Sequence, residues 1–321
     1  MASSFSASAW SHIYKRRADG HLIFYSTRDF LVYFTIFGVM AVKRKIQVLG
    51  LSLMYDHIHE LICSRSYAVQ AAFQQDVNSV FAKEWNRSTG LSGQCFETYG
   101  YAQKASDKHK RNAIAYLANN HVERRLCAKV EDIRWNFIAY AASPHPFSNP
   151  IRAKHCSTAL QRATERIRSL HNNGRWMTYE ILGNLVKGIT KKELGSLTDF
   201  IITTYNVIDY QATIAMYGSY QQMLTAINAN TGNEHDIKES FVGFDDAVYR
   251  KMASFMIQKA GLTDIRQVIT LPSDEKFKWM VELQAYSRAH YRQVSKFLHY
   301  PIRLVRSFGL DSEPLNDNPF P

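Results

Sequence analysis

The stretch of residues 48–62 constrains the fold of this chain more than any other. Apolar residues alternate with other types through it, which is typical of a β-strand. Because successive side chains of a strand point to opposite faces of a sheet, His57 and His59 share one face. Two imidazoles on one face of a strand can hold a divalent metal ion. By the same alternation Asp56 and Glu60 lie on the opposite face, so neither is expected to act as a base beside the histidines.

A second motif follows on a predicted helix that starts near Asp107 and ends near His121. Tyr116 and Asn120 are four residues apart, and they therefore share one face of that helix. Asn120 can supply a carbonyl oxygen as a third metal ligand, although Asn119 could serve instead. Two imidazole nitrogens and one oxygen, with open positions for phosphate oxygens, suit Mg²⁺ or Mn²⁺ acting on a phosphodiester. The alternative interpretation is that Tyr116 is a core aromatic residue and Asn120 an ordinary residue of the helix C-terminus.

Apolar spacing and capping residues predict the other elements of the N-terminal part. They are a strand at 11–17, a helix from Ser26 or Thr27 to about Lys43, a helix at 67–85 and one or two short strands at 93–102. The apolar run 30–42 is too short to span a bilayer and indicates a buried helix. This succession of strands and helices indicates an α+β fold, in which helices pack on a small antiparallel sheet.

Three prolines among residues 143–150 mark the predicted end of a first domain, or a strap across it. The chain is therefore divided into residues 1–150 and an all-helical domain at 151–321. Two predicted helices at about 273–299 have the proportions of a helix-turn-helix, which could contact duplex DNA. The alternative is an ordinary antiparallel helix pair. The tail beyond Arg303 is predicted to be a loop.

The charge of the chain points to a polyanionic partner. It carries 39 Lys and Arg against 28 Asp and Glu, a formal net charge of +11. The residues expected to contact a nucleic-acid backbone are Lys15, Arg16, Arg17, Lys43, Arg44, Lys108, Lys110 and Arg111. The alternative for any one of them is a solvated basic face. No C-x-x-C pair occurs, which argues against zinc-finger and thioredoxin-like classes. No secretory signal or membrane segment is expected, so a cytoplasmic location is predicted.

Two motifs carry a family resemblance. Residues 54–59, Met-Tyr-Asp-His-Ile-His, and residues 116–122, Tyr-Leu-Ala-Asn-Asn-His-Val, resemble motifs of the single-tyrosine HUH transposases, and most of all the REP-associated tyrosine transposases. The patterns of that family read approximately M-P-[ND]-H-[VI]-H and Y-[IL]-x-x-N-P-[VI]. The chain departs from them where Tyr55 and His121 replace the prolines. His121 keeps a backbone N–H that proline lacks, so the helix is expected to run on and to tilt Tyr116.

The resemblance covers roughly residues 10–150 and implies an HUH fold, ferredoxin-like or RRM-like, with the tyrosine helix lying across the histidine strand. It implies that His57, His59 and Asn120 bind Mg²⁺ or Mn²⁺ and that Tyr116 is the nucleophile. The implied reaction cuts and rejoins DNA through a 5′-phosphotyrosine, with release of a 3′-hydroxyl. The implied partner is single-stranded DNA with hairpins, such as REP-like repeats. The protein would be a monomer or homodimer associated with the bacterial nucleoid.

Two other function classes stay open at the level of sequence. One is a domesticated relative that binds DNA hairpins without cutting them. The departures at Tyr55 and His121 favour it, whereas the four retained site residues favour an enzyme. The other is an RNA-directed metal endonuclease on the same scaffold. A covalent adduct that survives denaturation separates the transferase from both, and discrimination against 2′-hydroxyls argues against the RNA endonuclease.

Overall fold

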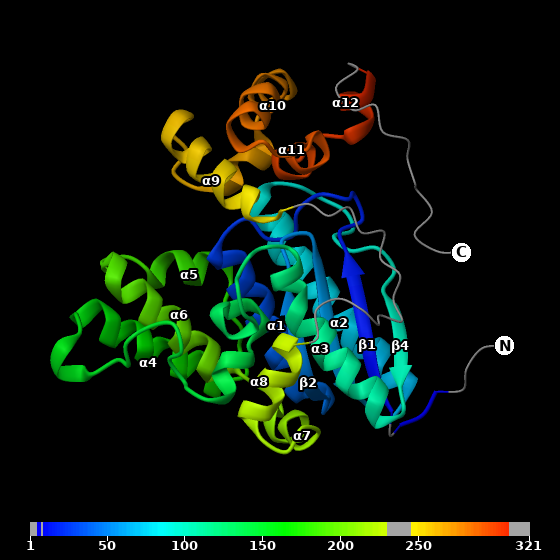
Figure 1. The fold of residues 1–321 in the computed structure, drawn as a ribbon. Coiled ribbons are helices and arrows are strands. Elements are labelled where there is room, and N and C mark those ends of the chain that lie inside the picture. Colours follow the sequence, from blue (N-terminus) through cyan, green and yellow to red (C-terminus); the bar gives the residue numbers. More distant parts are fainter. Residues whose placement is uncertain (1–4, 8, 230–244, 308–321) are drawn as a thin grey trace.

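The computed structural model describes residues 5–7, 9–229 and 245–307, and an antiparallel sheet lies at its centre (Figure 1). The strands are β1 (Trp10–Arg16), β2 (Gln47–Leu53), β3 (His57–Cys63) and β4 (Gly100–Lys104). Their order across the sheet is β2-β3-β1-β4, and every neighbouring pair is antiparallel. With helices packed on this sheet, the described chain has the predicted α+β architecture.

Three helices flank the sheet: α1 (Thr27–Arg44), α2 (Tyr67–Thr89) and α3 (Asp107–Glu123). α1 starts at Ser26, which forms a capping box with Asp29. α2 passes its predicted end at Trp85 and stops before Gly90, whose φ of 71° lies in the left-handed region that glycine adopts readily. α3 is capped by Ser106, one residue before Asp107, near which the helix was predicted to start. Local capping chemistry therefore sets where these helices begin and end.

α1 and α2 cover one face of the sheet and α3 lies on the other (Figure 1). Under α1 and α2, Lys15 of β1 and Glu60 of β3 form an ion pair whose side chains are fully buried. Tyr33 of α1 and Gln74 of α2 hydrogen-bond to both members of this pair. Burial lowers the pKa of Lys15, and the opposing effect of Glu60 does not cancel it. The prediction that Glu60 points away from the histidines is confirmed.

The rest of the described chain is helical, as predicted for its C-terminal half. The helices are α4 (Thr158–Asn172), α5 (Tyr179–Leu185), α6 (Lys191–Tyr205), α7 (Tyr210–Ala215), α8 (Tyr220–Ala229), α9 (Ala247–Lys259), α10 (Ser273–Ser287), α11 (Tyr291–Leu298) and α12 (Ile302–Ser307). Short 3-10 segments are Val130–Asp132, Arg134–Asn136, Ile138–Ala141, Ala153–His155 and Ile265–Thr270. α12 corrects the predicted loop beyond Arg303, and the remainder of that tail, 308–321, lies outside the described residues.

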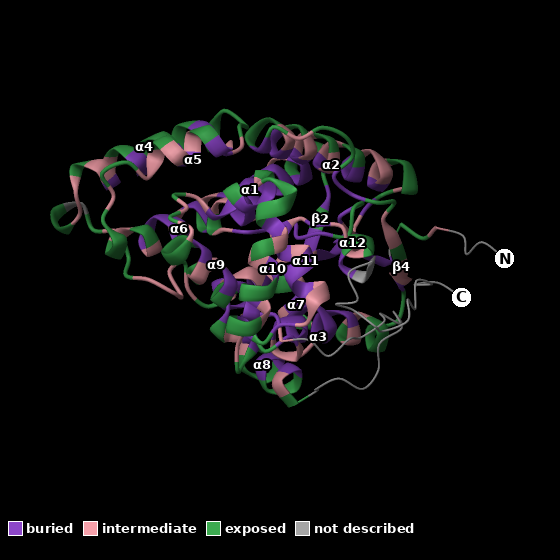
Figure 2. Cartoon of the chain, turned by 90° about the horizontal axis from the view of Figure 1, so that it is seen from above, coloured by how far each residue is buried: buried purple, intermediate pink, exposed green. Residues whose placement is uncertain are grey.

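One apolar core runs through both halves of the chain. Phe34 and Phe37 of α1 belong to the same buried cluster as Leu160 of α4 and Ile201 of α6. α1 is buried along most of its length (Figure 2), which confirms the buried helix predicted at 30–42. This shared core shows no break at residue 150. The division into two domains stays a prediction. None of the helices in the described ranges combines the length and apolar character that crossing a bilayer requires.

The helix pair predicted at about 273–299 is present as α10 and α11, joined through Arg288 in a left-handed conformation (φ 56°). Val294, Phe297 and Leu298 of α11 are fully buried or nearly so, whereas Tyr291, Arg292 and Lys296 are partly exposed. A recognition helix has to present side chains to the major groove. The burial of α11 favours the ordinary packed helix pair, and the helix-turn-helix stays a prediction.

Candidate active site

His57 and His59 lie on β3, between β2 and β1. Both are buried, and their ring centroids are 5.0 Å apart. In the register of β1 and β3, His59 is opposite Tyr14 and His57 is opposite Arg16. Directly opposed residues of an antiparallel pair share a face, so the two histidines project from one face of the sheet, as predicted.

α3 lies across this face and brings Tyr116 and Asn120 to the histidines. Asn120 Oδ1 is 3.3 Å from His57 Nε2. The Tyr116 ring is edge-on to the His59 ring, with 5.0 Å between centroids. Asn119 points elsewhere, because its Nδ2 donates to a backbone oxygen of α8 at 2.9 Å. The structure thus brings the four predicted residues together and favours Asn120 over Asn119.

Two of the candidate donor atoms are spaced as a divalent metal ion requires. Ligand atoms about 2.0–2.2 Å from a metal, at near right angles, lie about 3 Å from one another. The separation of His57 Nε2 and Asn120 Oδ1, 3.3 Å, is close to that value. His59 Nδ1 shares a hydrogen bond with His12 Nε2 at 3.1 Å, which leaves His59 Nε2 as the ring nitrogen for a metal. Burial and the neighbouring imidazoles lower the pKa of His59 well below its usual value, so its ring is in the neutral form that binds metals.

Asp56 contradicts the expectation that it faces away from the histidines. β3 begins at His57, so Asp56 precedes the strand and the alternation does not govern its side chain. Its Oδ1 lies 2.7 Å from His57 Nδ1, and its Oδ2 pairs with Lys296 of α11. Burial would raise the pKa of Asp56, but Lys296 and the hydrogen bond with His57 outweigh burial and hold it well below its usual value. Carboxylates in this position behind a ligating histidine fix its tautomer and orientation.

His12 and Tyr14 belong to the site, although the sequence analysis did not single them out. The His12 ring lies 5.4 Å from the Tyr116 ring, and the Tyr14 ring lies 4.9 Å from the His59 ring. The signal that could have found them is the alternation of β1. It places His12 and Tyr14 on the face opposite Lys15.

His121 and Tyr55 are the two residues at which the chain departs from the motifs that it resembles, and both make tertiary contacts. His121 Nε2 lies 3.1 Å from the backbone oxygen of Leu53 and ties α3 to β2. Burial lowers the pKa of His121 to about 3. α3 runs on to Glu123, as expected for a residue that keeps its N–H. Tyr55 packs against Tyr249 of α9, with 5.3 Å between ring centroids.

The site is closed in this structure. Tyr116 is 5% exposed and Asn120 is 1% exposed. A phosphate group therefore cannot reach the phenol unless an element over the sheet face moves.

Two of the predicted nucleic-acid contacts, Lys15 and Arg17, are wrong. Lys15 is fully buried and paired with Glu60 on the opposite face. Arg17 is 5% exposed, its Nε lies 2.7 Å from Asp19, and its guanidinium lies over the Trp85 ring. A buried cation that already has a partner is not available to a phosphate.

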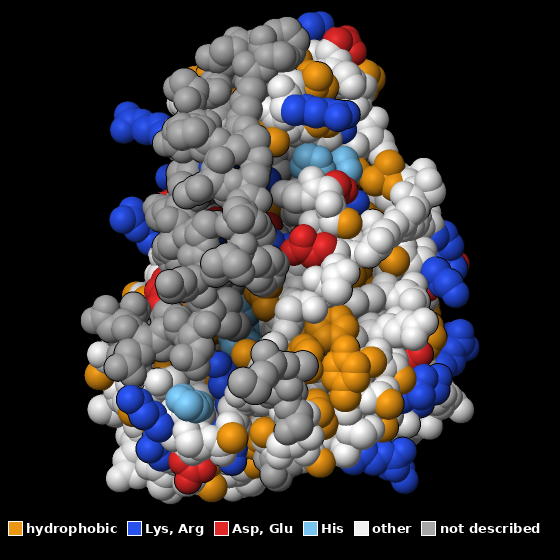
Figure 3. All heavy atoms as spheres, turned by 90° about the vertical axis from the view of Figure 1, so that its right-hand side faces the viewer, with side chains coloured by type: hydrophobic (Ala, Val, Ile, Leu, Met, Phe, Trp, Pro, Cys, Tyr) orange, Lys and Arg blue, Asp and Glu red, His pale blue; other side chains and the backbone are white. Residues whose placement is uncertain are grey.

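The other predicted contacts are at least partly exposed: Arg16, Lys43, Arg44, Lys108, Lys110 and Arg111. Lys108 and Arg111 are exposed in the first turns of α3, which also carries Tyr116. Arg44 pairs with Asp76 at 2.8 Å. Figure 3 shows Lys and Arg side chains along the margins of one face of the molecule.

Asp246, immediately before α9, is a buried acid near the site that no local sequence pattern indicates. It is 2% exposed, and burial, followed by the charge of Asp56, raises its pKa to about 7. Its backbone N–H donates to the carbonyl of Arg124, just after α3, at 3.1 Å. Its proximity to Asp56 depends on how α9 packs, which no local motif encodes.

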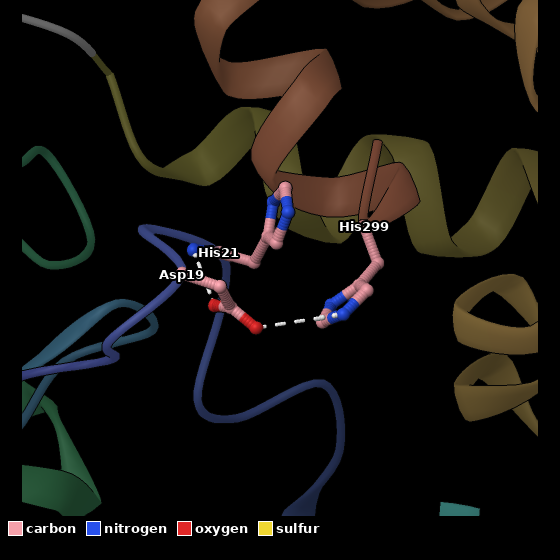
Figure 4. A group of neighbouring side chains, drawn as sticks. All are labelled: Asp19, His21 and His299. Atoms are coloured by element: carbon pink, nitrogen blue, oxygen red, sulfur yellow. Dashed lines mark hydrogen bonds and ion pairs between the residues drawn. The ribbon is translucent and has the colours of Figure 1, made fainter. Parts of the chain in front are cut away.

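A second group of metal-binding residue types, Asp19, His21 and His299, lies between the turn after β1 and the end of α11 (Figure 4). Asp19 Oδ2 is 3.5 Å from His299 Nε2, and the two imidazole centroids are 4.2 Å apart. Arg17 Nε donates to both carboxylate oxygens of Asp19, at 2.7 and 2.9 Å. Lys276 also lies close and donates to the backbone oxygen of His299 at 3.2 Å. A metal ion here would meet two cations and one neutralised carboxylate, so we assign none.

Comparisons of the chain with protein-family models, with curated proteins and with solved structures found no match. What the site can do is therefore judged from its own residues: nitrogen and oxygen donors for a metal, a phenol beside them, and a carboxylate behind one histidine.

Proposed function

We propose that this protein is a metal-dependent transferase of single-stranded DNA, similar to the REP-associated tyrosine transposases, which cuts and rejoins hairpin-bearing strands through a 5′-phosphotyrosine at Tyr116. The observation that carries the proposal is the convergence of His57, His59 and Asn120 beside that phenol, from two elements far apart in the sequence. Tyr116 belongs to a buried apolar cluster, as a core tyrosine does, but its ring also lies against the rings of His59 and His12.

The topology supports the same proposal. The element order β1-α1-β2-β3-α2-β4, with strand order β2-β3-β1-β4, supports the ferredoxin-like sheet that the resemblance implies. Its two crossover helices occupy one face and leave the other to α3. The HUH resemblance implies this arrangement of a histidine strand under a tyrosine helix.

The candidate metal ligands are His57, His59 and Asn120. A bound Mg²⁺ or Mn²⁺ would polarise and orient the scissile phosphate. Tyr116 Oη then forms a bond to phosphorus while the bond from phosphorus to the 3′-oxygen breaks, and the phenol proton ends on the released 3′-hydroxyl. Because the phosphotyrosine keeps the energy of the phosphodiester, attack by a 3′-hydroxyl rejoins DNA without ATP.

A phenol with a pKa of about 10 needs an acceptor for its proton near neutral pH. The His12 imidazole is not among the proposed ligands, and its ring lies 5.4 Å from that of Tyr116. In the tautomer that leaves His59 Nε2 for a metal, however, His12 Nε2 accepts the hydrogen bond of His59 Nδ1, so His12 orients His59 and does not take the phenol proton. Proximity of the phenol to the bound metal would then supply the activation.

A second candidate function is that of a DNA hairpin-binding protein that does not cut. The burial of Tyr116 and the anchoring of α3 to β2 by His121 favour it, because both oppose the movement that admits a phosphate. The exposed basic residues would serve either function. The two candidates differ in one product, the covalent adduct.

The test is a denaturing gel of the full-length protein with hairpin-bearing single-stranded DNA labelled at its 3′ end, in Mn²⁺. A 5′-phosphotyrosine keeps the 3′ fragment on the protein, so the label should migrate with it. Tyr116→Phe, His59→Ala and EDTA should each abolish the adduct. Tyr101→Phe is the matched control, since Tyr101 lies on β4 with 41% exposure.

An adduct in the wild type and in Tyr101→Phe, absent from Tyr116→Phe, would support the transferase. Binding without any adduct across a broad pool of hairpins would replace it with the non-cutting binder. Cleavage of RNA hairpins without an adduct would instead favour the RNA endonuclease.

A further inference from the structure

We propose that Asp56 and Lys296 are positioning residues of the candidate metal site, through which the C-terminal helices control its affinity for metal. Three contacts in series connect α11 with the site. Lys296 Nζ pairs with Asp56 Oδ2, Asp56 Oδ1 lies 2.7 Å from His57 Nδ1, and His57 Nε2 lies 3.3 Å from Asn120 Oδ1. The inference rests on the proposed function, because it concerns the same metal site.

The pair matters because Asp56 is mostly buried. The exposed fraction of its side chain is 12%, and that of Lys296 is 38%. Asp246, 2% exposed, repels Asp56, and Lys296 is the strongest of the cations that oppose this repulsion, ahead of Arg124. A carboxylate removed from water needs a countercharge, and Lys296 supplies it. Without that charge, the free energy of the carboxylate is lower when Asp56 turns away from Asp246 and toward water. That rotation would break its hydrogen bond to His57.

The bond to Asp56 decides which nitrogen of His57 is available. A neutral imidazole carries one proton, and donation from Nδ1 to Asp56 leaves the lone pair on Nε2, which faces Asn120. Loss of an outer partner of this kind lowers metal affinity about 10–100-fold. Lys296 therefore acts on the metal through two intermediates, without touching it.

Asp56 lies in the turn between β2 and β3, and helices α9 and α11 both contact this turn. The Tyr25 hydroxyl donates to the backbone oxygen of Lys296 at 3.3 Å and fixes that residue in place. Tyr55, next to Asp56, packs against Tyr249 of α9 and accepts a hydrogen bond from Arg250 Nε at 3.2 Å. Anything that separates α9 and α11 from this turn releases Asp56 and weakens the metal site. Because coupling between two events is reciprocal, metal binding should in turn hold α11 in place.

The test uses the full-length, DNA-free protein and counts unbound Mn²⁺ by electron paramagnetic resonance. Lys296→Met and Asp56→Asn should each raise the Kd for Mn²⁺ about 10-fold or more. Lys296→Arg should restore most of the affinity, because it keeps the charge. Lys278→Met, at an exposed position of α10, is the matched control. Hydrogen exchange adds a second readout, since Mn²⁺ should slow exchange in α11 of the wild type and not of Asp56→Asn.

The outcomes separate this inference from the proposed function. If the wild type binds Mn²⁺ through His59, shown by loss in His59→Ala, and Lys296→Met binds equally well, the inference is wrong and the metal site stands. If the wild type binds no Mn²⁺, or binds it independently of His59, the proposed metal site fails and the inference fails with it. A loss in Lys296→Met that Lys296→Arg does not rescue would assign Lys296 a merely structural role.

Discussion

Asp246 is a buried carboxyl whose ionisation should lower the stability of the fold as the pH rises. Its folded-state pKa of about 7 lies above the ordinary value of 3.8, because of burial and the charge of Asp56, which Arg124, His57 and Lys296 oppose. Between these pH values the folded protein holds a proton that the unfolded chain has lost. The associated stability is therefore full below pH 3.8 and is lost as the pH rises through 7.

Replacing Asp246 with Asn should remove this loss. The expected gain in the free energy of unfolding is about 1–3 kcal/mol at pH 8, since a buried charge beside another carboxylate disappears. The gain should shrink as the pH is lowered to 5. Thermal unfolding of wild type and variant at both pH values measures it, and an equal gain at both would show that Asp246 does not titrate in this range.

At the scale of elements, Asp199 of α6 holds together three segments that the sequence leaves apart. Its carboxylate is fully buried and accepts hydrogen bonds from Arg134 Nε and the Tyr140 hydroxyl, at 2.8 and 2.7 Å. It also accepts from the Phe147 backbone N–H and the Ser148 hydroxyl, at 3.1 and 2.7 Å. The proline-rich stretch 143–150 is thereby a strap bound to α6, in the helical half of the chain and not across residues 1–150.

Asp199→Ala should destabilise the protein by about 3–5 kcal/mol, because it leaves the partly buried Arg134 guanidinium and several donors without their acceptor. The control is Asp274→Ala, at an exposed position in the first turn of α10. Denaturant unfolding of both variants provides the comparison. A loss below about 1 kcal/mol would mean that water replaces the carboxylate and that the strap is not fixed by it.

Periodicity and capping residues predicted most elements, and their limits are physical. The two-residue alternation placed His57 and His59 correctly, and the four-residue spacing placed Tyr116 and Asn120 on one face of α3. The same alternation was wrong for Asp56, because a residue before a strand does not obey it. Apolar spacing found α11, but spacing shows which residues are apolar and not whether the remaining face meets solvent.

At the scale of the whole molecule, the candidate site is assembled from both ends of the described chain. The strand and helix that carry the chemistry lie within the first 123 residues, while Lys296 and Asp246 reach them from α11 and the start of α9. Such contacts depend on tertiary packing across more than half of the sequence. No motif or period encodes them, so the sequence indicated the candidate ligands but not the residues that position them.

The charge of the molecule leads to a prediction that separates exposed from buried cations. Each phosphate contact made by Lys or Arg releases counterions, which gives log K against log salt a slope of about −0.7 per contact on single strands. Lys108→Ala and Arg111→Ala, exposed near the start of α3, should each make this slope less steep by about 0.7. Lys15→Met should leave the slope unchanged while lowering the unfolding temperature, because Lys15 lies fully buried against Glu60. Fluorescence anisotropy of a labelled hairpin strand across a series of salt concentrations measures the slopes. Equal slopes for Lys108→Ala, Arg111→Ala and the wild type would show that the DNA does not run along α3. A phosphate would then have to reach Tyr116 by another route.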